Sequence, residues 1–312
     1  MPESVPADLL AQGSFDSVAA TTDGPPLAFA SRAAQGANAG HGWDLAAGRP
    51  LGAPIPDFPA DGTAWAFGAP AGSPVVAWTH RDRVHVHDLG TGHELSLDGQ
   101  PELLGLAVHG GRGGVVAVFG PASDAEVVVW DVLTGDRLSD FGLWLGHQTA
   151  VERRILHAAP AAGPLIGLPG DAVVNLLDVE RGEEVAAVPP ACAVLTPSPD
   201  GLVLVQPAPT GLHVLGLDGE RLAEPAAPSA CDQVAANRAG DRLLAAAVPE
   251  DEPSTALAWD ASGSAPARRV KLPAPVNDLA LAPDGTLLAA TDVGLIDLDV
   301  TAPSGVELVV FD

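Results

Sequence analysis

The stretch VVVWDVLTGDRL, residues 127–138, decides the fold of this chain. It contains an apolar run rich in β-branched residues, then an aspartate and a Thr-Gly-Asp turn, then the start of another strand-like run. This pattern is typical of two antiparallel strands joined by a tight turn. One such unit cannot bury its own apolar face, so we expect related units elsewhere in the chain.

Six further segments align on the aspartate at position 131. They are HGWDLAAGRPLG with Asp44, VHVHDLGTGHEL with Asp88, VVNLLDVERGEEV with Asp178, LHVLGLDGERL with Gly216 in the aspartate's place, TALAWDASGSAPARRV with Asp260, and GLIDLDVTAPSGVEL with Asp299. Successive anchors are 38 to 47 residues apart, close to the roughly 40 to 45 residues of one four-stranded propeller blade. The sequence therefore predicts an all-β fold, a seven-bladed β-propeller of four-stranded antiparallel blades, with residues 1–312 as a single domain.

The repeats resemble the WD-repeat family. The residues that carry the resemblance are Trp43-Asp44, Trp130-Asp131, Trp259-Asp260, the Pro-Asp-Gly turns at 199–201 and 283–285, and Gly146-His147 before the fourth anchor. In that family a histidine, a strand hydroxyl, a turn aspartate and the tryptophan form a hydrogen-bonded network within a blade. Here only His147 stands in a Gly-His pair at that place, and its blade has Leu177 where the tryptophan would be. The resemblance thus implies degenerate blades, held together mainly by apolar packing between sheets.

Two terminal segments compete to complete the last blade. Residues 306–311, VELVVF, have strong strand propensity and lie where the outermost strand of the seventh blade is due. Residues 8–13, DLLAQG, come just before the inner strand of the first blade, where the family's terminal clasp would start. We expect the C-terminal segment to complete the seventh blade.

Charge and composition exclude several classes of partner. Lys+Arg is 15 against 40 Asp+Glu, and the net charge of −25 repels phosphate backbones and anionic lipid surfaces. We therefore expect no nucleic acid and no membrane partner, and the absence of a leader pattern or a long apolar run predicts a cytoplasmic protein. The single lysine, Lys271, beside abundant Ala, Gly, Pro and Arg, indicates a GC-rich bacterial genome of actinobacterial type. Cys192 and Cys231 are too few for a disulfide framework and are interpreted as small buried side chains.

Short catalytic signatures are missing from the chain: it has no phosphate-binding glycine loop, Gly-x-Ser-x-Gly, HExxH or CxxC. The densest titratable cluster is THRDRVHVHD, 79–88, in which His80, His85 and His87 form a weak candidate metal site. Packing is the favoured interpretation, because His85 and His87 take the positions of Val128 and Trp130 in the next repeat. We expect no catalytic residue, no metal and no cofactor. The acidic stretch PEDEPS, 249–254, lacks calcium-loop spacing and is interpreted as a loop within the sixth blade.

The segment SDFGLWLGHQTAVERRIL, 139–156, is the strongest candidate for partner binding. Aromatic and arginine side chains dominate interface hot spots, and family topology places this connection on the same face as the turn at 80–83. The candidate residues are Trp144, His147, Arg153, Arg154, Arg81 and Arg83. The alternative is that Trp144 folds back over a blade while the arginines pair with Asp140 and Glu152.

Two functions remain open. The favoured one is a non-catalytic WD-repeat platform, a monomer that binds another protein of unknown identity. The alternative is a small-molecule-binding or catalytic propeller, for example a hydrolase, lyase or isomerase, with its site at the mouth of the central channel.

Overall fold

Seven antiparallel sheets follow one another along the chain. The structure is a computed structural model and describes residues 8–32, 38–59, 64–120, 124–143, 156–157, 165–169, 173–188, 194–198, 201–227, 229–261, 267–301 and 308–309. Six sheets have four strands and one has five, which makes the protein an all-β seven-bladed propeller. Among the described residues the one helical element is a short 3-10 turn, η1 (Pro70–Gly72).

The contacts between residues divide the chain into two compact units. One comprises Met1–Arg49, Pro54–Ala60 and Thr196–Asp312, and the other Pro50–Ala53 and Asp61–Leu195. We number the blades by their anchors, so that blades two, three and four belong to the second unit and the remaining blades to the first. In the second unit the strands are β6 (Trp65–Gly68), β7 (Val75–His80), β8 (Arg83–Asp88), β9 (Glu94–Asp98), β10 (Leu103–His109), β11 (Arg112–Phe119), β12 (Ala125–Asp131), β13 (Arg137–Leu143), β14 (Leu156–His157), β15 (Leu165–Pro169), β16 (Val174–Asp178) and β17 (Glu183–Val188).

The first unit contains blades one, five, six and seven. Its strands are β1 (Asp8–Gln12), β2 (Phe15–Ala20), β3 (Leu27–Arg32), β4 (Ala39–Asp44), β5 (Arg49–Pro56), β18 (Val194–Ser198), β19 (Gly201–Ala208), β20 (Gly211–Gly216), β21 (Arg221–Ala223), β22 (Cys231–Ala239), β23 (Arg242–Pro249), β24 (Thr255–Asp260), β25 (Arg268–Lys271), β26 (Val276–Leu281), β27 (Thr286–Thr291), β28 (Gly294–Asp299) and β29 (Leu308–Val309). Each of the seven predicted anchors, Gly216 included, is the last residue of the third strand of its blade. The predicted repeat is confirmed at every blade.

Apolar side chains fill the space between neighbouring sheets. Blades two and three share a cluster that includes Val75, Val84, Leu104 and Val115, all fully buried. In the first unit, blades seven and one share another that includes Phe15, Trp43, Leu288 and Leu295. Because the middle strands of a blade are covered on both faces, their sequences are almost continuously apolar and do not alternate.

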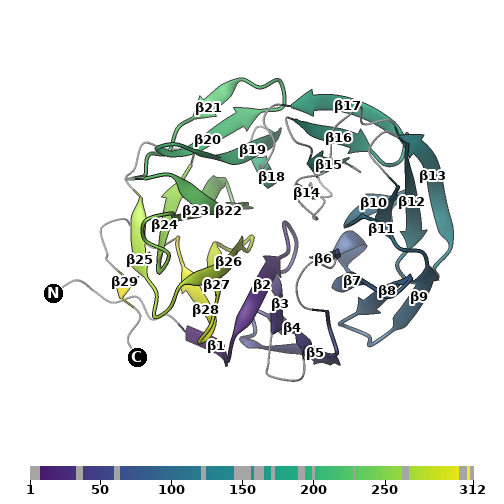
Figure 1. The fold of residues 1–312 in the computed structure, drawn as a ribbon, viewed down its shortest axis with the longest axis horizontal. Helices are drawn as coiled ribbons and strands as arrows, with labels where there is room; N and C mark the ends of the chain where they lie inside the picture. The colour runs from purple at the N-terminus through teal and green to yellow at the C-terminus, as the bar shows by residue number, and fades with distance from the viewer. Residues whose placement is uncertain are drawn as a thin grey trace. The chain divides into compact units, whose positions relative to one another are not determined.

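The prediction that the C-terminal segment completes blade seven is wrong. Strand β1 pairs antiparallel with β28, with Asp8 opposite Asp297 and Gln12 opposite Gly294, and so supplies the fourth strand of this blade. Figure 1 shows β1, in purple, beside the yellow strand β28. Strand β29 pairs instead in parallel with β25, as a fifth strand on blade six. Strand propensity identified residues 308–309 as extended but carries no information about which edge they join.

Candidate functional site

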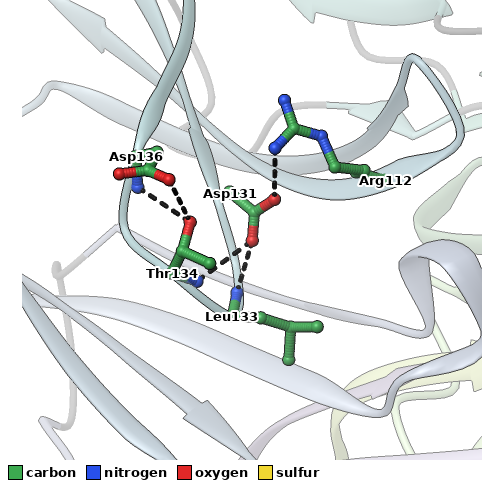
Figure 2. Close-up of polar contacts among 5 residues, drawn as sticks. All are labelled: Arg112, Asp131, Leu133, Thr134 and Asp136. Carbon is green, nitrogen blue, oxygen red and sulfur yellow. Dashed lines mark hydrogen bonds and ion pairs between the residues drawn. The ribbon is translucent and has the colours of Figure 1, made fainter.

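The anchor aspartates are turn-forming residues. Asp131 Oδ1 accepts hydrogen bonds from the backbone N–H groups of Leu133 (2.8 Å) and Thr134 (3.1 Å), and its Oδ2 pairs with Arg112 Nη1 at 3.2 Å. Figure 2 shows this arrangement, with Thr134 also bonded to Asp136. Asp88 and Asp178 bind the backbone of their turns in the same way. These carboxylates hold the backbone of their turns.

In blade five a different residue stabilises the turn after the third strand. An added Cβ at Gly216 would lie 2.7 Å from Asp218 Oδ1, so a larger residue at the anchor would require the Asp218 carboxylate to move. Asp218 instead accepts a hydrogen bond from the backbone N–H of Glu220 at 2.9 Å. In this repeat the turn carboxylate therefore stands two residues after the anchor position.

Side-chain amides tie together the inner strands of blades six, seven and one. Asn237 on β22 is 1% exposed, and its Nδ2 donates to the carbonyl oxygens of Leu281 (2.8 Å) and Thr21 (2.9 Å), one from each of the other two blades. Gln233 donates to the carbonyl of Asn277 at 2.8 Å, and Asn277 donates to that of Phe15 at 2.9 Å. Polar groups on these inner strands therefore serve cohesion between blades. Alignment of the repeats did not reveal them, because they do not recur in every blade.

The turn between β7 and β8 presents the arginines predicted to bind a partner. His80 is opposite Arg83 in the register, and the turn residue Arg81 has a positive φ of 56°. The side chains of His80, Arg81 and Arg83 are exposed. Arg83 pairs with Asp98 at 3.0 Å and also donates to the carbonyl of Ser96 at 3.1 Å. Since Arg83 and Asp98 are 49% and 94% exposed, this ion pair contributes little stability.

Below the turn, aromatic rings cover one face of blade two. His85 stacks on Trp78 with ring centroids 5.3 Å apart, and His80 lies 6.1 Å from His85. Burial lowers the pKa of His85, and the charges of His80 and Arg83 lower it further. Trp65 and Trp78 are buried and belong to the core.

The candidate metal ligands do not converge. His80 and His85 lie on the same face, but His87 Nδ1 is 3.0 Å from Glu94 Oε1, and His93 Nε2 is 2.9 Å from the carbonyl of Leu133. Over the described parts of the chain, no three His, Cys, Asp or Glu side chains are arranged to hold a metal ion. Those same parts contain no helix with the length and apolar character to span a membrane.

The remaining predicted partner-binding residues lie outside the described residues. They are Trp144, His147, Arg153 and Arg154. Of the prediction for 139–156, the structure describes residues 139–143 as part of β13 and 156 as part of β14. The alternative partners for these arginines are equally untested, because Glu152 also lies outside the described residues, while Asp140 pairs with Arg137 at 3.2 Å.

The acidic loop of blade six makes polar contacts with Ser229 and Arg269, which lie before and after it in the chain. Residues 250–254 connect β23 to β24, as predicted. Asp251 accepts a hydrogen bond from Ser229, and Glu252 pairs with Arg269 on β25. The hydrogen bond from Arg269 lowers the pKa of Glu252, and a second one from Thr255 lowers it further. This loop is a structural connection.

Comparison with known proteins supports the fold. No protein-family model matches the chain, and no curated protein matches it in sequence. Solved structures are similar in fold: the β-propeller domain of Cps50 (Swd1) from Myceliophteria thermophila matches 94% of this chain and 99% of its own, with a TM-score of 0.62 and 14% identity. The Dos1 propeller matches 99% and 97%, with a TM-score of 0.57 and 12% identity. A chain of a mitotic checkpoint complex matches 96% and 92%, with a TM-score of 0.60 and 13% identity. The class of this protein is thus the seven-bladed β-propeller.

Proposed function

We propose that this protein is a non-catalytic platform of the WD-repeat type, which binds another protein in the cytoplasm. The observation that carries the proposal is the similarity in fold, over almost the whole chain, to propellers of which one belongs to a mitotic checkpoint complex. A propeller offers a rigid frame with variable turns, which suits recognition of another protein. Fold alone does not fix function, so the proposal also needs a surface.

The turn at 80–83 is the part of that surface that we can describe. It is held by the β7–β8 ladder and presents two exposed arginines on a chain with a net charge of −25. Arg83 can exchange the exposed Asp98 for a partner's carboxylate at little cost, since exposed ion pairs are worth about 0 to 1 kcal/mol. Arginine and tryptophan are both enriched at interface hot spots. Trp144, His147, Arg153 and Arg154 are the further residues that we propose for partner binding.

The alternative, a small-molecule or catalytic site at the channel mouth, has less support. The inner-strand side-chain amides that we can describe in blades six, seven and one, namely Gln233, Asn237 and Asn277, already donate to backbone carbonyls. A catalytic site assembled from these residues would have to break the ties between blades.

Affinity purification from the source cells tests the proposal. Wild-type protein is expected to retain a polypeptide at a fixed ratio, and the paired variants Arg81→Ala/Arg83→Ala and Trp144→Ala/Arg153→Ala are expected to lose it. The control is Arg137→Ala/Arg221→Ala, which removes two half-exposed arginines from the outer strands β13 and β21. A protein that retains a stoichiometric metal or metabolite in native mass spectrometry, and no polypeptide, would contradict the proposal.

A further inference from the structure

Arg32, at the end of β3 in blade one, forms no hydrogen bond or ion pair through its guanidinium group with any residue that the structure describes. Its Nε is buried without a hydrogen-bond partner, and no carboxylate in the described residues forms an ion pair with it. Arg112, Arg242 and Arg269, by contrast, each pair with a carboxylate of their own blade. In a chain with 40 acidic residues an unpaired, half-buried arginine is unusual, and leaving its donors unsatisfied costs free energy.

Gly13 makes room for this guanidinium. The glycine has a φ of 120°, and an added Cβ would lie 2.6 Å from Arg32 Nη2 and 2.7 Å from Nε. No other residue type would allow the backbone to approach so closely. Gly13 is also fixed in place, because its N–H donates to the carbonyl of Val293 at 3.1 Å.

A second unpartnered nitrogen lies on the same face of the sheet. His41 is opposite Ala30 in the β3–β4 register, so its side chain projects from the face that also carries Arg32. His41 Nε2 is buried without a hydrogen-bond partner, and the ring stacks on Trp43 with centroids 5.7 Å apart. Burial and, to a smaller extent, the charge of Arg32 lower the pKa of His41, so the imidazole is neutral at neutral pH. The cluster therefore carries one positive charge and two unsatisfied nitrogens.

We propose that Arg32 and His41 form a binding site for a single carboxylate group. A guanidinium matches a carboxylate in geometry and can donate two parallel hydrogen bonds to it. A carboxylate carries one negative charge and balances the one positive charge of the cluster. A phosphate dianion would exceed that charge, and the net charge of −25 would repel it more strongly.

This site is independent of the proposed function, because it lies on blade one and uses none of the residues assigned to partner binding. The carboxylate can belong to a free small molecule or to the end of a peptide. Both share the chemistry that the site recognises, and the experiment below separates them.

Nuclear magnetic resonance of the arginine Nε–H groups in the full chain tests the site. Acetate, inorganic phosphate and N-acetyl-diglycine are titrated separately at constant ionic strength, with the exposed Arg49 as an internal reference. We expect the Arg32 signal to shift and saturate with acetate, while Arg49 does not. A peptide that binds more tightly than acetate indicates a peptide terminus, and equal affinity indicates that the carboxylate alone is recognised.

Two variants and two outcomes complete the design. His41→Phe preserves the stack on Trp43 but removes Nε2, and should weaken acetate binding about fivefold, the effect of one lost hydrogen bond of about 1 kcal/mol. Gly13→Ala places a methyl group against the guanidinium and should abolish the shift. Saturation by phosphate at lower concentration than by acetate overturns the assignment to carboxylate. A shift of Arg32 that stays linear and equal to that of Arg49 overturns the site itself.

Discussion

At the scale of single residues, polar side chains in this propeller act mainly on the backbone. Asn237 binds carbonyls of two neighbouring blades, and Asp131 binds N–H groups of its own turn. Such hydrogen bonds contribute little net free energy to folding. Removing one partner destabilises the protein much more, because the buried backbone group left behind has no water to bind. The predictions at this scale follow from that asymmetry.

Replacing Asn237 should destabilise the protein more than replacing any half-exposed amide. Asn237→Leu leaves the carbonyls of Thr21 and Leu281 without this donor, and we expect a loss of about 2 to 4 kcal/mol in the free energy of unfolding. Asn277→Ala, at a partly exposed position, is the matched control and should cost less than about 1 kcal/mol. Urea unfolding measures both, and equal losses would contradict the role assigned to Asn237.

The anchor aspartate should stabilise its turn about as much as an N-cap residue stabilises a helix. Asp131→Ala removes the acceptor for two backbone N–H groups, and a loss of about 1 to 2 kcal/mol is expected. The exposed neighbour Asp136 provides the control, because Asp136→Ala should change stability by less than about 0.5 kcal/mol. Thermal or urea unfolding distinguishes these values, and a neutral Asp131→Ala would show that the turn does not need its carboxylate.

The thiol of Cys231 should be unreactive in the folded protein. Burial, together with the nearby negative charges of Asp232, Glu250 and Asp251, raises its pKa to about 11. Because the folded pKa lies above the ordinary value, this group favours the folded state below about pH 9, and that contribution is lost as the pH rises towards 11. In a Cys192→Ser background, iodoacetamide at pH 8 should label the protein only in denaturant. Rapid labelling of the native protein would show that Cys231 is accessible.

At the scale of elements, the two terminal strands have unequal roles. Strand β1 adds a full edge to blade seven, and Leu10 and Ala11 pack against the apolar cluster shared with blade one. Strand β29 contributes two register pairs at the outer edge of blade six. Both join an existing sheet edge, but only β1 completes a four-stranded blade.

Deleting the two segments should therefore have different effects. Removal of residues 1–12 exposes the edge of β28 and part of the cluster below it, and should cost more than about 3 kcal/mol or prevent folding. Removal of residues 302–312 loses the two register pairs of β29 with β25 and should cost about 1 kcal/mol. Circular dichroism during urea unfolding gives both values. If the C-terminal deletion is the more damaging, the assignment of β1 to blade seven is wrong.

At the scale of the whole molecule, the seven repeats could be predicted from the sequence. The strand that completes the last blade could not. The anchors recur at blade-length intervals because each blade needs the same turn at the same place, so even Gly216 could be recognised by its surroundings. The competition between residues 8–12 and 308–309 could not be resolved, because both are short apolar strands and pairing depends on distant edges. No sequence pattern indicated the role of Asn237, because that role depends on contacts with other blades. The same holds for Arg32 and His41, which are notable only because their buried nitrogens lack hydrogen-bond partners. The arginines at 81 and 83 were predicted on a surface turn, and they lie on one.

A crystal structure of the full chain tests the central claim most directly. The account predicts seven sheets in one chain, with residues 8–12 paired antiparallel to residues 294–297 as the fourth strand of the last blade. Six or eight sheets, or residues 308–309 in the place of β1, would contradict it.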